Sequence, residues 1–265
     1  MIKYLDKFSL KNKFVFIAGG AGLIGAEACR ACASVGAKIL ILDSDVSKAR
    51  VLVKEILDAG GKAYFEKFNM ADLKELDSRM EELTVKYGVP NVWVNATYPR
   101  SKDWVRPLEK ITVNYVRENV DIHFNSYLLS SRKIAMLMKK HRVAGSIINF
   151  GSIYGVRAND LRVYEGTKLS GEIVYCGIKA GIINLTKYLA EYFGEYGIRA
   201  NTICPGGLGD PRQDKKFVKQ YEARVPLKRM GNPQDVAGAV VYLASEASSY
   251  VTGTTFMVDG GWTAV

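Results

Sequence analysis

Short apolar runs alternate with longer segments of helical periodicity along most of the chain. The first run, KFVFIA (13–18), stops at two glycines, and the residues that follow take up a helical rhythm that ends near Gly36. The same change recurs and places the expected strands at 13–18, 38–43, 62–68, 91–96, 146–150, 198–204 and 254–259. The helices expected between them are 46–59, 72–87, 112–141, 174–195, 213–222 and 233–246. This alternation predicts parallel strands joined by crossover helices.

The length and composition suit this architecture. The 265 residues, 48% of them apolar, are enough to bury the core of one large domain, and neither a repeat nor a linker interrupts them. We therefore expect an α/β fold over residues 1–265, a Rossmann-type doubly wound parallel sheet of about seven strands in a three-layer α/β/α single domain. Residues 1–110 would form mainly the dinucleotide-binding half, and residues 111–265 the catalytic and substrate half.

Charge and cysteine content limit the classes of partner and location. The 37 basic and 27 acidic side chains give a formal net charge of +10, which favours an anionic partner. The charges are scattered among apolar residues, so nucleic acid is not an expected partner. The sequence has no signal peptide or membrane-length apolar run, and its four cysteines lack the spacing of a disulfide framework. We therefore expect a reduced, cytoplasmic protein with no membrane role and no metal.

The first expected strand leads into the motif AGGAGLIG. Gly19, Gly22 and Gly25 fall at a strand-to-helix turn, where the absence of a Cβ lets the backbone approach a pyrophosphate and the helix start offers free N–H donors. Asp43 ends the second strand, where a carboxylate accepts hydrogen bonds from both adenosine ribose hydroxyls and repels a 2′-phosphate. The pattern predicts NAD as the cofactor. Basic residues early in the next helix keep NADP open as the less favoured alternative.

Further cofactor contacts are expected where strands end, because ligands of open α/β sheets bind at the carboxyl ends of the strands. The third strand is followed by Asn69 and Met70, and Met70 would form an apolar wall for adenine. The fourth strand ends in Asn95 and Ala96. The cofactor contacts expected from this half are Gly19, Gly22, Leu23, Ile24, Gly25, Asp43, Asn69, Met70, Asn95 and Ala96.

The pattern Tyr-x-x-x-Lys occurs twice, as Tyr164/Lys168 and as Tyr175/Lys179. A phenol has an ordinary pKa near 10, so proton exchange with an alcohol at neutral pH needs a nearby positive charge, which a lysine one helical turn on supplies. Glycines surround Tyr164, whereas apolar residues at helical intervals follow Lys179, so only the second pair begins a helix. Because a rigid element must hold this geometry, we assign the general acid/base role to Tyr175. Lys179 would support it electrostatically and bind the nicotinamide ribose, so both residues also count as cofactor contacts.

The assignment of Tyr175 leaves a long polar loop ahead of the catalytic helix. This loop and the two loops that face it are rich in arginine. Such a set suits a hydroxylated and anionic small molecule, and the expected substrate contacts are Arg100, Arg157, Arg162, Tyr164 and Arg212. The alternative is that these are ordinary solvated loop charges.

Three segments of the tail are the most specific part of the sequence. They are IRANTICPGG (198–207), PLKRMGNPQDVAGAVVYLAS (226–245) and SSYVTGTTFMVDGGW (248–262). Together with the glycine turn, Ser152 and the Tyr-x-x-x-Lys pattern, they resemble the short-chain dehydrogenase/reductase family, and the resemblance runs from FSLKNKFVFIAGGAGLIG to the end of the chain.

The resemblance implies roles for several residues. Ser152 would orient the substrate oxygen beside Tyr175, and Pro205 and Gly206 would border the nicotinamide as further cofactor contacts. The helices at 112–141 and 174–195 would pair with a second copy in a homodimer or homotetramer.

The sequence departs from the family pattern in the glycine turn, in VNAT (94–97) and at His123. Leu23 stands where most members have glycine, and VNAT replaces the usual Asn-Asn-Ala-Gly. His123 occupies the position of the asparagine that holds a water of the proton relay. A histidine can also hold a water or pass a proton, so His123 joins the expected catalytic residues. The alternative is that it caps or packs beneath the site.

The residues and the resemblance together predict an NAD-dependent oxidoreductase that interconverts a secondary alcohol and a ketone. The segments NATYPR and VYEGT and the long loop resemble the subgroup associated with flagellin modification and nonulosonic-acid sugar synthesis in bacteria, which implies an amino- or phosphosugar substrate. The alternative enzyme is a 3-oxoacyl-carrier-protein reductase, against which Asp43 counts because those enzymes mostly resemble NADPH users. The alternative of another class is a non-catalytic NAD(H)-binding sensor or scaffold, which His123 and VNAT permit.

Overall fold

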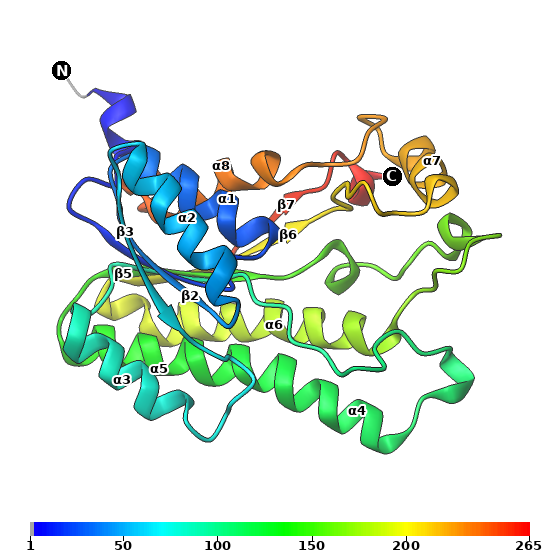
Figure 1. Ribbon diagram of the computed structural model, residues 1–265, viewed down its shortest axis with the longest axis horizontal. Helices are drawn as coiled ribbons and strands as arrows, with labels where there is room; N and C mark the ends of the chain where they lie inside the picture. The colour runs from blue at the N-terminus through cyan, green and yellow to red at the C-terminus, as the bar shows by residue number, and fades with distance from the viewer. Residues whose placement is uncertain (1–2) are drawn as a thin grey trace.

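Seven parallel strands form the sheet that the sequence predicts. The computed structural model describes residues 3–265, and its strands are β1 (Phe14–Ala18), β2 (Lys38–Asp43), β3 (Lys62–Lys67), β4 (Val92–Asn95), β5 (Gly145–Phe150), β6 (Ile198–Pro205) and β7 (Thr255–Val258). All neighbours pair in parallel, in the order β3-β2-β1-β4-β5-β6-β7 (Figure 1). The predicted doubly wound α/β fold is confirmed.

Helices cover both faces of the sheet (Figure 1). One face carries α1 (Leu23–Ser34), α2 (Val46–Asp58) and α8 (Pro233–Ala244). The other carries α3 (Leu76–Tyr87), α5 (Ser126–Lys140) and α6 (Ile173–Phe193). Because successive strand side chains point to opposite faces, Val15 and Ile17 of β1 pack in the layer of α1 and α8, whereas Phe16 packs in the layer of α3 and α5. Within residues 3–265, no helix has both the length and the apolar character needed to cross a membrane.

Two helix predictions need correction. The helix expected at 112–141 consists of α4 (Val113–Asn119), a π-helical turn (Val120–Asn125) and α5. A π-helical turn places one extra residue in the helix, and this one carries the buried His123. The helix expected from residue 72 begins at Leu76, because a turn precedes it in which Asn69 accepts the N–H groups of Ala71 and Asp72.

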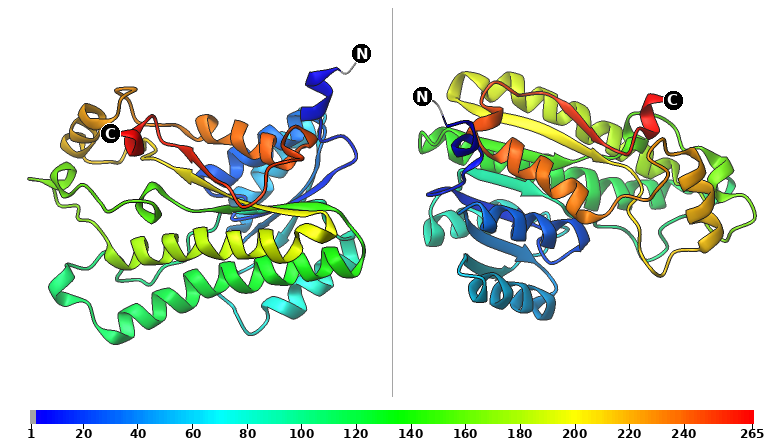
Figure 2. Two further views of the ribbon diagram at one scale, coloured as in Figure 1. Left: turned by 180° about the vertical axis from the view of Figure 1, so that it is seen from behind. Right: turned by 90° about the horizontal axis from the view of Figure 1, so that it is seen from above.

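The chain order reverses at β1. Ala18, the last residue of this strand, lies beside Leu42 of β2 on one side and Asn95 of β4 on the other. The connections from β1 and β4 therefore leave in opposite directions and open a crevice at the carboxyl ends of the strands. Figure 2 shows helix α7 (Lys215–Arg224) and the C-terminus at one end of the molecule, with the N-terminus at the other.

Candidate active site

The glycine motif forms a tight turn between β1 and α1. Gly19 has a φ of +71°, and a Cβ there would lie 2.9 Å from the carbonyl group of Ala96. A Cβ at Gly25 would collide with the Gly19 carbonyl oxygen, so the turn requires glycine at both positions. Gly22 precedes α1 and offers no side-chain cap, which leaves the first N–H groups of the helix available to a phosphate.

Asp43 lies opposite the glycine turn, at the end of β2. Its carboxylate oxygens accept the backbone N–H groups of Ala21 and Asp45, each at 2.9 Å. Lys48, the nearest basic residue early in α2, pairs with Asp45 at 2.9 Å. The carboxylate is therefore held in place against the glycine turn, where it fits a ribose diol.

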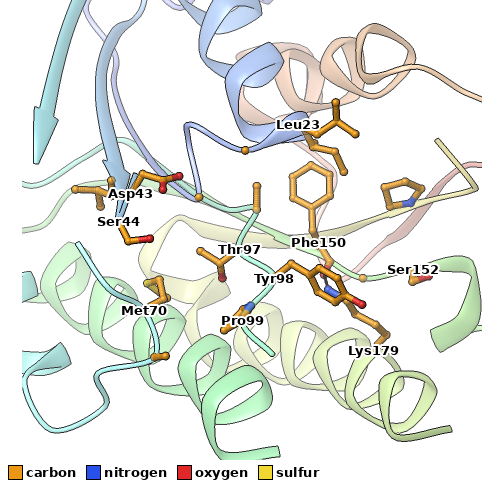
Figure 3. Close-up of a pocket in the computed structure, with 18 of the residues that line it drawn as sticks. Leu23, Asp43, Ser44, Met70, Thr97, Tyr98, Pro99, Phe150, Ser152 and Lys179 are labelled. Atoms are coloured by element: carbon orange, nitrogen blue, oxygen red, sulfur yellow. Dashed lines mark hydrogen bonds between the residues drawn. The ribbon is translucent and has the colours of Figure 1, made fainter. Parts of the chain in front are cut away.

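These elements border one cleft of about 560 Å³ (Figure 3), a volume typical of cofactor sites. The predicted cofactor contacts that line it are Gly19, Gly22, Leu23, Ile24, Asp43, Asn69, Met70, Ala96, Tyr175, Lys179, Pro205 and Gly206. Gly25 lies behind the turn, and Asn95 is fully buried. The Asn95 side-chain oxygen accepts the N–H and the hydroxyl hydrogen of Thr97 at 3.2 and 2.7 Å, so Asn95 shapes the cleft through Thr97, which lines it. Within residues 3–265, no group of three or more His, Cys, Asp or Glu residues is arranged to hold a metal ion.

Helix α6 brings the second Tyr-x-x-x-Lys pair into the cleft. The Glu172 side chain caps the start of the helix, so Tyr175 lies in its first turn and Lys179 in the next. The Lys179 ammonium lies 5.6 Å from the centre of the Tyr175 ring and donates a hydrogen bond to the Phe150 carbonyl oxygen at 2.8 Å. Ser152, which follows β5, also lines the cleft. These three polar groups therefore converge beside the glycine turn.

Burial has the largest effect on the pKa values of Tyr175 and Lys179. It raises the pKa of the Tyr175 phenol well above its ordinary value, and a hydrogen bond with Ser152 opposes the rise only in part. Burial also lowers the pKa of Lys179 to about 7. The lowering of the tyrosine pKa that the sequence leads us to expect from Lys179 is therefore not found, because burial raises the pKa and only the Ser152 hydrogen bond opposes it.

The first Tyr-x-x-x-Lys pair has a different setting. Tyr164 ends a 3-10 turn, and its hydroxyl bonds with Tyr154 and Asn159 at 3.2 and 3.1 Å. Its ring stacks on Phe217 of α7 with 5.6 Å between the ring centres, while Lys168 is exposed in the loop. Tyr164 thus connects the loop to α7 and is not among the residues that line the cleft.

Two of the predicted substrate arginines are held by neighbouring aspartates. Arg162 contacts both carboxylate oxygens of Asp160 at 2.8 and 2.7 Å. Arg212 contacts Asp210 in the same bidentate manner at 2.9 and 2.5 Å. Arg157 donates to the Trp262 carbonyl oxygen at 3.1 Å. None of these three described residues lines the cleft, so an anionic substrate would have to compete for them.

His123 is fully buried beneath the cleft. Within the described residues, neither of its ring nitrogens has a hydrogen-bond partner. Burial and the nearby Lys179 charge hold the pKa of His123 well below its ordinary value, so the imidazole is neutral. Two unpartnered buried nitrogens suit a buried water, as expected if His123 holds a water of the proton relay. The alternative, that His123 packs beneath the site, is also supported, because the ring centres of Tyr98 and Tyr127 lie 5.4 and 5.8 Å from that of the imidazole.

Tyr98 is a cleft residue that the sequence reasoning missed. It lines the cleft below Phe150, close to Lys179 (Figure 3), and its ring centre lies 5.6 Å from that of Tyr175. Arg100 is the fourth predicted substrate arginine. Its guanidinium group lies over the Tyr98 ring, 4.8 Å from the ring centre. An aromatic residue just beyond a strand end at the point where the strand order reverses is the signal that could have identified it.

Comparisons with known proteins identify proteins that this chain is similar to. A family model described as "Enoyl-(Acyl carrier protein) reductase" matches residues 19–263. The chain is 30% identical over 255 residues to the post-translational flagellin modification protein A of Campylobacter coli, covering 96% of this chain and 99% of that protein.

Two solved structures are also similar. One is a short-chain dehydrogenase from Leptospira borgpetersenii with bound NAD+, with a TM-score of 0.83 and 33% identity over 99% of this chain and 96% of that chain. The other is a gluconate 5-dehydrogenase from Burkholderia cenocepacia in complex with NADP and tartrate, with a TM-score of 0.87 and 27% identity over 98% of this chain and 99% of that chain.

Proposed function

Because the chain belongs to the short-chain dehydrogenase/reductase family, whose members are NAD(P)-dependent oxidoreductases, we propose that it uses NAD to interconvert a secondary alcohol and a ketone on an amino- or phosphosugar. The sugar would serve bacterial surface-glycan or flagellin modification. The observation that carries the proposal is the convergence of Tyr175, Lys179 and Ser152 beside the glycine turn in one cleft.

Ser152 and Tyr175 have different roles at the reacting oxygen. The Ser152 hydroxyl orients that oxygen, and the Tyr175 phenol exchanges the proton with it. Burial keeps the phenol protonated at neutral pH, which suits proton donation to a ketone; in the reverse direction a charged Lys179 favours the tyrosinate. Bound NAD supplies the chemistry of hydride acceptance from the carbon, or of its return as NADH.

The preference for NAD rests on Asp43. Its carboxylate is fixed by two backbone N–H groups at the place where the ribose hydroxyls would lie, and a 2′-phosphate there would meet a negative charge. The Lys48 ammonium, which could otherwise bind that phosphate, is paired with Asp45.

The sugar substrate is supported by the relative from C. coli, whose name refers to flagellin modification and whose length is matched almost completely. The loop ahead of α6 carries Arg157 and Arg162, but both are engaged in hydrogen bonds within the protein. The proposal therefore relies on the hydroxyl groups of the substrate more than on an anionic group.

We extend the proposal to assembly and location. The outer faces of α5 and α6 expose Met136, Tyr188 and Tyr192 to 49%, 65% and 53%, and such a patch suits pairing of these helices in a homodimer or homotetramer. Light scattering during gel filtration measures this directly. All four cysteines are free thiols, which suits the reducing cytoplasm.

Formation of NADH from a panel of amino- and phosphosugars tests the proposed function, with NADP in place of NAD as the cofactor control. We expect turnover of at least one sugar with NAD, and its loss in Tyr175→Phe. Reduction of an acetoacetyl-acyl-carrier protein by NADPH would instead support the 3-oxoacyl-carrier-protein reductase, an alternative supported by a relative of that name from Rickettsia conorii, to which the chain is 32% identical over 258 residues. Tight NAD binding without turnover of any substrate would support a non-catalytic sensor.

A further inference from the structure

The orientation of the Tyr98 hydroxyl is fixed by its neighbour. The Trp104 indole N–H donates a hydrogen bond to the Tyr98 oxygen at 2.7 Å. An indole N–H can only donate, so the phenol oxygen is the acceptor in this pair and its own hydrogen must point elsewhere. Within residues 3–265 that hydrogen has no protein acceptor. Burial raises the pKa of Tyr98, so the hydroxyl keeps its proton at neutral pH.

The loop that carries this pair is anchored. The Trp104 ring packs 6.3 Å from that of Tyr115, centre to centre, and the loop backbone is held at Ser101. There the Asn119 side chain accepts the Ser101 N–H and donates to its hydroxyl, both at 2.9 Å, and both residues are buried. The free hydrogen-bond donor of Tyr98 is therefore held in one position before a ligand arrives, which reduces the entropy lost on binding.

The donor lies close to the reacting centre. The Tyr98 ring meets the Tyr175 ring edge to face with 5.6 Å between centres, and both residues line the same cleft. Two phenols whose ring centres are 5.6 Å apart in one cleft can contact the same small ligand at two of its oxygens. Tyr98 is 43% exposed, so a ligand can reach it.

We propose that Tyr98 is a specificity-determining residue that donates a hydrogen bond to an oxygen on the carbon next to the one being oxidised or reduced. The preferred substrate class is then a ring with oxygens on adjacent carbons, in preference to a ring with a single alcohol. The inference rests on the proposed function, because it takes Tyr175 as the group that contacts the reacting oxygen.

Two simple alcohols test the inference with the NAD-loaded enzyme: cis-1,2-cyclohexanediol, which has the adjacent oxygen, and cyclohexanol, which lacks it. The unmodified enzyme should favour the diol in kcat/KM. Tyr98→Phe keeps the ring and should reduce this preference about tenfold, the effect of losing one hydrogen bond to the substrate. Trp104→Phe should reduce it by less, since the Tyr98 hydroxyl remains but loses its fixed orientation. Tyr250→Phe, at a fully exposed tyrosine, is the matched control and should leave both activities unchanged.

The ratio of the two activities separates recognition from damage, because a purely structural effect of Tyr98→Phe would lower both in parallel. Parallel losses, or equal kcat/KM values for the diol and the single alcohol in the unmodified enzyme, would overturn the inference while leaving the proposed function in place. Absence of turnover of either alcohol and of every sugar in the panel would overturn the proposed function, and the inference with it.

Discussion

The Glu172 carboxylate accepts a hydrogen bond from the Tyr115 hydroxyl at 2.7 Å, which connects the start of α6 to α4. The same carboxylate accepts the N–H groups of Val174 and Arg106 at 3.0 and 3.1 Å. One buried side chain therefore caps α6 just before Tyr175 and fixes the end of the loop that carries Tyr98.

Removal of this carboxylate should affect both stability and turnover. Glu172→Ala leaves three donors without an acceptor, and we expect a loss of about 3 kcal/mol in the free energy of unfolding together with a lower kcat. Glu172→Gln retains one acceptor oxygen and should lose about half as much. Urea unfolding and steady-state kinetics measure the two effects, with Glu191→Ala, exposed on the same helix, as the control. An unchanged kcat in Glu172→Ala would show that the cap does not position Tyr175.

The two tyrosines of the repeated motif should respond differently to the same substitution. Tyr175→Phe removes the hydroxyl that we propose exchanges the proton, and we expect kcat to fall by about a thousandfold or more while NAD still binds. Tyr164→Phe removes hydrogen bonds to Tyr154 and Asn159 and should chiefly lower stability, by about 1 kcal/mol. Kinetics and NAD titration of both variants check this. Substantial activity in Tyr175→Phe would exclude its assigned role.

Asp43→Ala should weaken NAD binding about tenfold or more and raise the use of NADP relative to NAD. The variant loses the carboxylate that would bind the ribose hydroxyls and also the acceptor of the Ala21 N–H. The ratio of kcat/KM for the two cofactors is the measurement. Lys48→Ala, which removes an exposed charge paired with Asp45, should leave that ratio unchanged. An equal decrease of kcat/KM with NAD and with NADP in Asp43→Ala would argue against a role of Asp43 in selecting NAD over NADP.

Gly25 and Gly177 offer a matched pair of glycine substitutions in helices. Gly25→Ala places a Cβ against the Gly19 carbonyl group, so we expect loss of NAD affinity and of stability. At Gly177 of α6, nothing lies within 4 Å of an added Cβ, and alanine should stabilise the protein by about 0.5 to 1 kcal/mol. Thermal unfolding with and without NAD compares them. Normal NAD binding in Gly25→Ala would mean that the glycine turn can accommodate a Cβ at this position.

Lys179 should make stability depend on pH in a defined direction. Its pKa is about 7 in the folded protein against 10.5 ordinarily, so between these values the unfolded chain binds a proton that the folded chain does not. The free energy of unfolding therefore rises with pH across this window, and the cost of the buried lysine is largest below pH 7. Lys179→Met should be inactive. The free energy of unfolding of this variant should exceed that of the unmodified protein most at low pH, and the difference should shrink by about 4 kcal/mol between pH 6 and pH 10. Urea unfolding of both proteins at several pH values measures the difference, and a constant difference would contradict a lowered lysine pKa.

Local patterns were enough for the fold and for the placement of several cleft residues. The glycine turn, the strand that ends in Asp43 and the helix that starts just before Tyr175 are each encoded within a few consecutive residues. The alternation of such units is what predicts parallel strands joined by crossover helices. The choice between the two Tyr-x-x-x-Lys pairs also rested on local helix signals, and the structure places Tyr175, not Tyr164, on a long helix.

Features that depend on distant contacts were not predictable in this way. Arg162 and Arg212 have aspartates two residues before them, yet whether they face a ligand or those aspartates depends on loop shape. The pairing of Tyr98 with Trp104 depends on a loop that Asn119 holds from another element. The upward pKa shift of Tyr175 follows from burial by several elements, which no spacing in the sequence reveals.

The pairing of β1 with β4 has a consequence for synthesis on the ribosome. As the chain emerges, β1 can pair with β2 at once, but its other edge has no partner until β4 has been translated. Until then the nascent chain presents an open strand edge to any other chain nearby. A truncated product that ends before β4 would keep that edge exposed, and it would be a substrate for chaperones and proteases before it could ever bind a nucleotide.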